Sequence, residues 1–132
     1  RVLVIPPILG MMSEYREASG NRERNMRHSS QFRLLLENLL NNSVRHNPKP
    51  VNITVHTRRA GERFCLTVAD DGIGYPAAVL VALNAAEPAE NAPHILGLYV
   101  VQQIAAAHGG MAVFGQNTPC GAKTTVWLPG RA

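Results

Sequence analysis

Apolar side chains recur at three- and four-residue spacing along residues 31–46, which is the pattern of one buried face of a helix. The recurring positions are Phe32, Leu35, Leu36, Leu39, Leu40 and Ser43. Ser29 or Ser30 can cap this helix at its start, and Asn47-Pro48 ends it. The pattern therefore predicts a long amphipathic helix with its leucine face in the core.

Four other segments predict strands. They are residues 51–57, 64–69, 111–116 and 122–128. The first two alternate between apolar and polar side chains, and the short link at residues 59–62 is typical of a hairpin. We expect these two strands to pair antiparallel, and the last two to be joined by a turn at residues 119–121.

The rest of the chain predicts three more helices, one short strand and a mobile loop. The helices are residues 8–19, 76–83 and 97–108, the strand is residues 22–28, and the loop is residues 84–96. The resulting order alternates helices with strands and ends in two strands. It is typical of an α+β fold, a two-layer α/β sandwich with a mixed, mostly antiparallel sheet and about three helices on one face.

The size and composition of the chain indicate a single globular domain. It has 132 residues, of which 45% are hydrophobic and 17% charged. No apolar run approaches the roughly 20 residues that span a bilayer. The chain starts with arginine and has no signal-peptide pattern, so we expect it to be a piece of a longer protein.

Charge and cysteine content argue against nucleic-acid binding and against a cysteine metal site or a disulfide framework. The formal net charge is +4, but the bases are scattered except at residues 22–33, and aromatic residues are only 5%. This differs from the dense basic stripe with stacking aromatics that nucleic-acid binding needs. Cys65 and Cys120 have neither metal-site spacing nor the number for a disulfide framework, which favours a reducing cytoplasm.

The first candidate site is the turn D-D-G-I-G at residues 70–74, which follows an expected strand. Glycines let the backbone turn sharply and approach a flat ligand closely. An ionised carboxylate only accepts hydrogen bonds, so Asp70 could accept from the amino group of adenine and reject guanine. On this stretch alone, a plain turn between a strand and a helix explains the residues equally well.

The second candidate site lies on the long helix. Asn38, Asn42 and Arg45 fall at i, i+4 and i+7 and share a face opposite the leucines. Asparagine is unfavourable inside a helix, so two on one face suggest a polar site. The amide oxygen could bind Mg²⁺ and the guanidinium a phosphate, whereas the alternative is a solvated polar face.

The third candidate site is Gly97, which opens an expected helix after the mobile loop. The free backbone N–H groups and the dipole of a helix N-terminus favour a phosphate there. A glycine that simply ends a loop is the alternative.

Taken together and in this order, the three sites resemble the GHKL superfamily of ATPases, and sensor histidine kinases in particular. Residues 35–47 (LLENLLNNSVRHN) resemble the N box, and residues 70–74 match the first glycine box, D-x-G-x-G. Residues 96–110 are similar to the second glycine box and its helix, and residues 121–129 to the closing strand. The resemblance spans residues 30–129 and implies a Bergerat fold that binds ATP and Mg²⁺.

The resemblance also implies roles for single residues. It implies that Asn42 ligates Mg²⁺ with support from Asn38, that Arg45 lies near the phosphates, and that His46 lies beside the nucleotide. It assigns Asp70 to the adenine amino group and makes Asp71 a neighbour on the solvent side.

Further pocket residues are implied by the glycine boxes and the closing strand. By resemblance, Gly72 and Gly74 shape the base pocket, Gly97 and Leu98 lie by the phosphates, and Thr124 belongs to the nucleotide-binding set.

The chain departs from the family pattern at the second glycine box. The family usually has G-x-G-L-G-L, but residues 93–98 read P-H-I-L-G-L, and the lid at residues 75–96 is short and has no aromatic F box. Fewer backbone donors should reach the phosphates, which predicts weak ATP binding. Residue 38 is Asn and not a water-activating Glu, and Glu37 faces another way, so hydrolysis by a general base is not expected.

The leading hypothesis is the catalytic domain of a bacterial sensor histidine kinase, with residues 1–29 as an N-terminal helix and strand and residues 30–129 as the nucleotide-binding core. No histidine here has a phosphoacceptor context, so the acceptor should lie on a dimerisation domain before Arg1. We expect a monomeric fragment, a homodimeric parent anchored in the inner membrane, a cytoplasmic location for this domain, and a response regulator as partner. A degenerate regulatory module and an anti-sigma-factor-type serine kinase are the alternatives.

Overall fold

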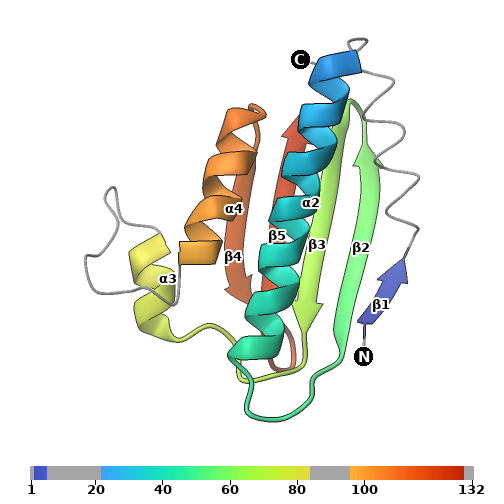
Figure 1. Ribbon diagram of the computed structural model, residues 1–132. Coiled ribbons are helices and arrows are strands. Elements are labelled where there is room, and N and C mark those ends of the chain that lie inside the picture. Colours follow the sequence, from blue (N-terminus) through green and yellow to red (C-terminus); the bar gives the residue numbers. More distant parts are fainter. Residues whose placement is uncertain (1, 6–21, 84–95, 130–132) are drawn as a thin grey trace.

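The computed structural model describes residues 2–5, 22–83 and 96–129, with side chains described from residue 30 onward. The described elements follow the order strand, helix, two strands, two helices, two strands (Figure 1). They are β1 (Val2–Ile5), α2 (Arg22–Arg45), β2 (Ile53–Ala60), β3 (Arg63–Asp70), α3 (Ala77–Leu83), α4 (Leu96–Ala107), β4 (Met111–Gln116) and β5 (Ala122–Pro129).

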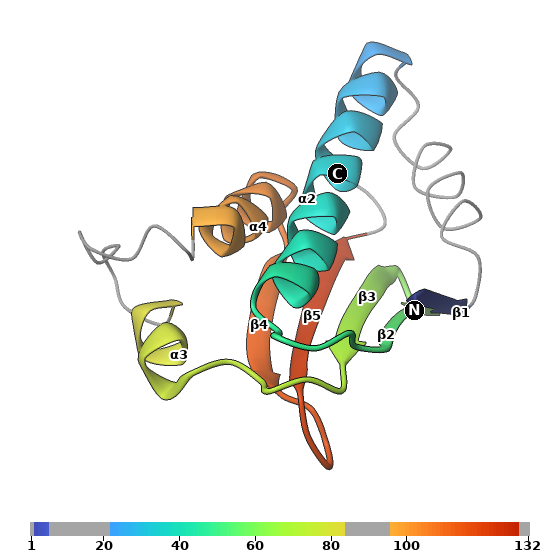
Figure 2. The ribbon, with the colours of Figure 1, turned by 60° about the horizontal axis from the view of Figure 1, so that its bottom comes forward.

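The strands form one sheet in the order β1-β2-β3-β5-β4. β1 runs parallel to β2, and every other neighbouring pair is antiparallel. α2 and α4 lie across one face of the sheet, and α3 lies beside them (Figure 1, Figure 2). The expected α+β sandwich with a mixed, mostly antiparallel sheet is confirmed, as is the hairpin of β2 and β3.

The hydrophobic core lies between the helices and the sheet. Buried and exposed positions alternate along β2 because successive side chains of a strand point to opposite faces. The most deeply buried apolar side chains are Leu35 and Leu39 of α2, Val55 of β2, Leu66 of β3, Leu98 and Val101 of α4, and Val126 of β5. Burying one such side chain is worth roughly 1.5–3 kcal/mol, so this layer holds α2 and α4 onto the sheet.

The opposite face of the sheet carries a row of four residues aligned across four strands. The register places Met111 beside Trp127, Trp127 beside Cys65, and Cys65 beside Arg58. The Arg58 guanidinium lies 5.4 Å from the centroid of the Trp127 ring, a cation–π distance. Cys65 sits between them in the register and is only 2% exposed, so the pair covers its thiol.

Two expected features at the N-terminal end differ from the structure. The short strand expected at residues 22–28 is wrong, because α2 begins at Arg22, and Ser29 and Ser30 therefore lie inside the helix and do not cap it. The stretch contains three arginines, one glutamate and one methionine, which favour helix, and it can extend a helix that packing has already anchored. β1 was not among the expected elements.

Other expectations fall on residues that are not described. The helix expected at residues 8–19 lies outside the described residues, and so does the loop expected at 84–96 apart from Leu96, which is the first residue of α4. Within the described ranges, no helix has both the length and the apolar character to cross a membrane.

Candidate functional site

A cavity of about 80 Å³ lies where the C-terminal end of α2 meets the loop after β3 and the start of α4. The lining residues are Asn42, His46, Asn47, Ile73, Gly74, Tyr75, Pro76, Val79, Leu98 and Ala122. Ligand pockets commonly enclose roughly 300–1,000 Å³, so this cavity can hold only part of a nucleotide.

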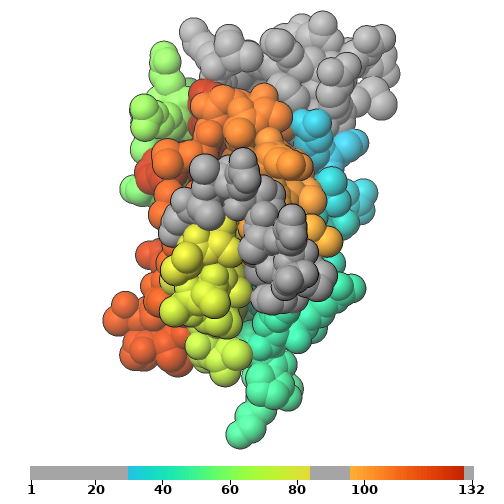
Figure 3. All heavy atoms as spheres, turned by 90° about the vertical axis from the view of Figure 1, so that its left-hand side faces the viewer, coloured from blue at the N-terminus to red at the C-terminus, as the bar shows by residue number. Residues whose placement is uncertain are grey.

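The outer side of the site is formed by α3 and α4. These helices lie side by side on this face of the molecule (Figure 3). The Gln102 amide of α4 donates to the Leu83 carbonyl of α3 at 2.8 Å, and the Tyr99 hydroxyl donates to the Ala82 carbonyl at 3.4 Å. These bonds satisfy two carbonyls at the C-terminal end of α3 and join the helix to α4.

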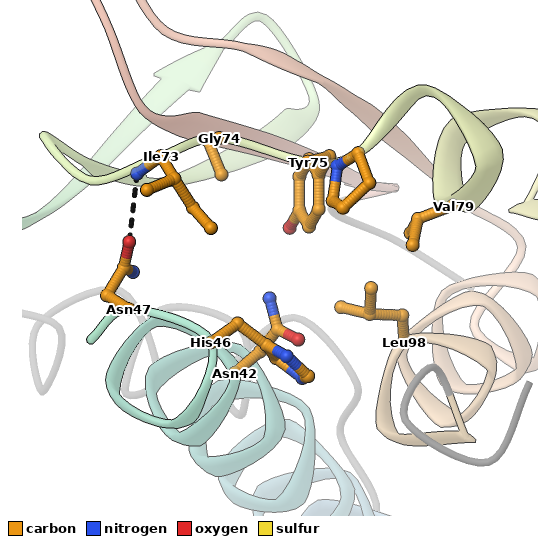
Figure 4. A pocket seen from close by; sticks show the side chains of 10 residues that line it. Asn42, His46, Asn47, Ile73, Gly74, Tyr75, Val79 and Leu98 are labelled. Atoms are coloured by element: carbon orange, nitrogen blue, oxygen red, sulfur yellow. Dashed lines mark hydrogen bonds between the residues drawn. The ribbon is translucent and has the colours of Figure 1, made fainter.

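The last turn of α2 and the residue that follows the helix bring two of the expected residues into the cavity. The side chains of Asn42 and His46, four residues apart, both face Leu98 of α4 (Figure 4). The Asn42 amide is partly buried and makes no hydrogen bond to any side chain or backbone group in the described ranges. An amide that faces a cavity and has no partner among the described residues is a candidate ligand-binding position.

Asp70, the last residue of β3, is a buried carboxylate beneath the cavity. It is 3% exposed and is not one of the lining residues. Its Oδ2 accepts from the Ser43 hydroxyl at 2.8 Å, and its Oδ1 accepts from the backbone N–H groups of Gly72 at 3.0 Å and Ala122 at 3.1 Å. A carboxylate has about four acceptor positions, so within the described part of the chain one on Oδ2 is still available.

The loop that follows Asp70 is held against the end of α2 by Asn47. The Asn47 Oδ1 accepts from the Ile73 N–H at 2.9 Å, and its Nδ2 donates to the Ser43 carbonyl at 2.6 Å (Figure 4). A Cβ on Gly72 would collide with this amide. Gly72 therefore allows α2 to approach the loop, and it does not line the cavity.

Tyr75 forms the inner wall of the cavity, with its buried hydroxyl hydrogen-bonded to Thr124 of β5. Burial raises the pKa of Tyr75 to about 12 because it disfavours the charged phenolate. The Tyr75 ring also makes an edge-to-face contact with Phe114, with the centroids 5.9 Å apart. Thr124 thus lies behind the wall and supports the pocket from outside it.

Asp71 lies on the solvent side, as expected. Its carboxylate is exposed and accepts from the Asn52 backbone N–H at 2.8 Å and from the Asn52 Nδ2 at 2.9 Å. The side-chain hydrogen bond from Asn52 is the main cause that lowers the pKa of Asp71. The exposed Cys120 of the β4–β5 turn lies on this side too, and its Sγ donates to the Asp71 carbonyl at 3.4 Å.

The remaining expected residues lie at the edge of the cavity or outside it. Asn38 donates from Nδ2 to the Leu34 carbonyl at 2.8 Å, and its Oδ1 faces Gly97, where a Cβ would come within 2.7 Å. Arg45 is exposed and is not a lining residue. The cavity thus brings together Asn42, His46, Gly74 and Leu98, with Asp70 and Gly72 beneath it.

Ser43, Asn47 and Tyr75 were not among the expected site residues. Ser43 occupies a core position of the leucine stripe, and a buried hydroxyl needs a partner, which is a usable signal for a buried acceptor. Asn47 carries no such signal, because an asparagine before a proline is already explained by the end of the helix. Tyr75 carries no such signal either.

The residues present fit a magnesium ion only in combination with a phosphate ligand. In the described part of the chain, no group of three or more His, Cys, Asp or Glu side chains could hold a metal ion. Mg²⁺ commonly takes one or two protein oxygens and completes its shell with phosphates and water. The Asn42 amide oxygen, which has no hydrogen-bond partner among the described residues, meets that requirement.

Comparison with known proteins gives one family and one group of solved structures. Residues 27–132 match the family described as histidine kinase-, DNA gyrase B-, and HSP90-like ATPase. No curated protein sequence matches the chain.

Three solved structures illustrate the likeness. Full-length ShkA in complex with AMPPNP is 24% identical, with a TM-score of 0.61, over 75% of this chain and 21% of that one. The mycobacterial sensor histidine kinase MprB is 25% identical, with a TM-score of 0.57, over 78% of this chain and 72% of that one. The catalytic domain of histidine kinase ThkA is 16% identical, with a TM-score of 0.63, over 77% and 68%. This chain therefore spans about a fifth of full-length ShkA.

Proposed function

Because this chain belongs to the family of histidine kinase-, DNA gyrase B- and HSP90-like ATPases, we propose that it is the Mg-ATP-binding catalytic domain of a sensor histidine kinase. It would donate the γ-phosphoryl group of ATP to a histidine on a dimerisation domain that precedes it. The likeness in fold to three histidine kinases supports this choice within the family.

The observation that carries the proposal is that two polar positions at one cavity have no partner in the described part of the chain. The Asn42 amide faces the cavity, and among residues 22–83 and 96–129 no donor takes the fourth acceptor position of Asp70, just beneath the cavity. An acceptor suits the amino group of adenine, and an amide oxygen suits Mg²⁺. A ligand that carries both a base and phosphates uses both positions, whereas a simple turn or a solvated helix face needs neither.

Each residue then has a definite part. Asp70 would select adenine, Tyr75 and Leu98 would enclose the base, and Asn42 would hold Mg²⁺. Bound to the phosphates, Mg²⁺ neutralises charge that develops during phosphoryl transfer. Arg45, which is exposed near the end of α2, would contact a phosphate that projects from the cavity.

Direct hydrolysis of ATP is not part of the proposal. A general base would be needed at the position of Asn38, and the nearest acid on α2 is Glu37. The Glu37 side chain is 58% exposed and forms an ion pair with Arg33 at 3.5 Å on the outer surface of α2. Asn38 cannot act as a base. Transfer to an acceptor histidine on another segment needs no base from this chain, because positioning and charge neutralisation suffice.

The same proposal implies the oligomeric state, the partner and the location of the parent protein. The parent would be a homodimer joined through its phosphoacceptor domain, and a response regulator would receive the phosphoryl group from it. This domain would lie in the cytoplasm, with the parent anchored in the inner membrane.

A titration with a fluorescent ATP analogue, with and without Mg²⁺, tests the proposal. We expect saturable, weak binding that Mg²⁺ strengthens in the wild type and no longer strengthens in Asn42→Ala. Asn41→Ala is the matched control, because it makes the same change on the exposed side of α2. No saturable binding by the wild type, or an equal Mg²⁺ effect in Asn42→Ala, would contradict it.

The reduced second glycine box favours a second candidate, a regulatory module that keeps the fold and does not transfer phosphate. In the described part of this box only Gly97 remains as glycine, between Leu96 and Leu98. Autophosphorylation of a longer chain that includes the dimerisation domain separates the two candidates. Transfer that is lost in Asn42→Ala supports the kinase, and binding without transfer supports the module.

A further inference from the structure

The floor loop of the cavity, residues 70–75, is bound by the hairpin of β4 and β5. Gln116, the last residue of β4, makes two hydrogen bonds to the backbone of Tyr75. Its Oε1 accepts from the Tyr75 N–H at 2.9 Å, and its Nε2 donates to the Tyr75 carbonyl at 2.6 Å. The neighbouring Asn117 donates from Nδ2 to the Asp70 carbonyl at 2.8 Å. The hairpin thus holds both ends of the loop.

These bonds replace those that regular structure would supply. Residues 71–76 belong to no helix or strand, so their peptide groups have no ladder partner. The side-chain amide of Gln116 pairs with Tyr75 as a backbone strand would, and Asn47, two residues after the end of α2, accepts from Ile73 on the other side. Besides the Asp70 carboxylate, which accepts from the Gly72 N–H, side-chain amides from two distant parts of the chain therefore hold the conformation of the loop.

The glycine before Tyr75 fits this role. Gly74 has a φ of +81°, and a Cβ there would lie 2.5 Å from the Gln116 Oε1. Only glycine combines this backbone conformation with so close an approach. Gly74 therefore makes room for the contact between Gln116 and Tyr75, and it also lines the cavity.

We propose that Gln116 is a positioning residue of the nucleotide pocket, which sets the Tyr75 wall and the Asp70 floor in place before the base binds. The inference rests on the proposed function, since it assigns Gln116 a part in nucleotide affinity. Its physical basis is preorganisation: a loop already held in the bound conformation does not lose that freedom on binding. Without the pairing, the free loop samples other conformations and only a fraction of molecules is ready to bind.

The test measures affinity for Mg-ATP by calorimetry in three variants at pH 8. Gln116→Ala removes both bonds and should weaken binding by roughly tenfold or more. Gln103→Ala is the matched control, since Gln103 is an exposed glutamine on α4 away from the cavity, and it should bind as the wild type does. Thermal unfolding of each variant shows whether it is folded.

Gln116→Glu supplies a readout that a merely structural role would not move. The introduced carboxylate can still accept from the Tyr75 N–H, but its second oxygen repels the Tyr75 carbonyl. Protonation turns that oxygen into a donor and restores the pairing. The affinity of this variant, divided by that of the wild type at the same pH, should therefore rise as the pH falls from 8 to 4, because a glutamate ordinarily has a pKa of about 4.3. The division corrects for the other ionisable groups near the site, which both proteins share, namely His46, Asp70, Asp71 and Lys123.

The outcomes separate this inference from the proposed function. If the wild type does not bind Mg-ATP, the proposed function fails and the inference falls with it. If the wild type binds and a folded Gln116→Ala binds equally well, only the inference is overturned. If Gln116→Ala does not fold, the pH profile of Gln116→Glu decides, and a flat ratio overturns the inference.

Discussion

Replacing Asp70 by asparagine changes one oxygen of a buried carboxylate into an NH₂ group and keeps the size of the side chain. The remaining oxygen can still accept from the N–H groups of Gly72 and Ala122, as Oδ1 of Asp70 does now. The Ser43 hydroxyl, which now donates to Oδ2, can rotate and accept from the new NH₂ group. The variant should therefore fold.

The cost in stability follows from the three bonds. A hydrogen bond to a charged group contributes roughly 1.5–3 kcal/mol and a neutral one roughly 0.5–1.5 kcal/mol, so each bond loses about 1 kcal/mol. Removing a buried charge offsets part of that loss. We expect Asp70→Asn to lower the free energy of unfolding by about 1–3 kcal/mol, measured by urea denaturation.

The effect on nucleotide recognition should be larger and depend on the base. The available position of Asp70 would accept from the amino group of adenine, but after substitution an NH₂ donor faces that group. Losing a charge-assisted bond of roughly 1.5–3 kcal/mol weakens ATP binding about 10- to 150-fold. GTP presents a carbonyl at the same place and can accept from the new NH₂. Calorimetric titrations with ATP and GTP should therefore show a reduced preference for ATP.

The control for this prediction is the same substitution one residue along. Asp71 is exposed and pairs with Asn52, so Asp71→Asn should leave both affinities unchanged. The reasoning is refuted if a folded Asp70→Asn binds ATP as tightly as the wild type. It is equally refuted if the affinities for ATP and GTP fall by the same factor, because that result would make Asp70 a structural support only.

Two further predictions concern stability. The pKa of Tyr75 is about 12 in the folded chain against about 10 in the unfolded one, so the stabilisation from its neutral hydroxyl is complete below pH 10 and falls by about 1.4 kcal/mol per pH unit between pH 10 and 12. Urea denaturation of the wild type and Tyr75→Phe across this range should show that the wild type loses free energy of unfolding relative to the variant. A constant difference in free energy of unfolding would count against the burial argument. Leu35 is fully buried, so Leu35→Ala should cost about 2–5 kcal/mol in the same assay. The neighbouring Leu34 is 47% exposed, and Leu34→Ala should cost well under 1 kcal/mol, so equal losses would mean that α2 is rotated from the described orientation.

The elements with a periodic apolar pattern could be predicted from the sequence, because burial on one face imposes that period. Phe32, Leu35 and Leu39 repeat along α2 and are all buried. The alternation along β2 has the same origin. The start of α2 could not be read in this way, since residues 22–28 have no apolar period and the helix there continues from a packed segment.

Within the candidate site, the residues that could be predicted are those whose chemistry is local to one motif. Asn42 lies in the last turn of α2 and His46 directly follows the helix, so their spacing groups these two, and Gly74 belongs to the glycine turn. Asn47 and Gln116 could not be predicted, because their bonds to Ile73 and Tyr75 join positions 26 and 41 residues apart in the chain. An amide that pairs with a distant backbone leaves no periodicity or spacing to detect.

The two cysteines of the chain differ in accessibility, and this difference provides a practical tool. Cys65 is covered by Arg58 and Trp127, whereas Cys120 is exposed on the hairpin turn, with its sulfur 3.4 Å from the Asp71 carbonyl. A maleimide dye should therefore attach to Cys120 and spare Cys65, without any substitution in the chain. A label at that position would report movements of the neighbouring loop in the wild-type protein, as a built-in optical sensor of its conformation.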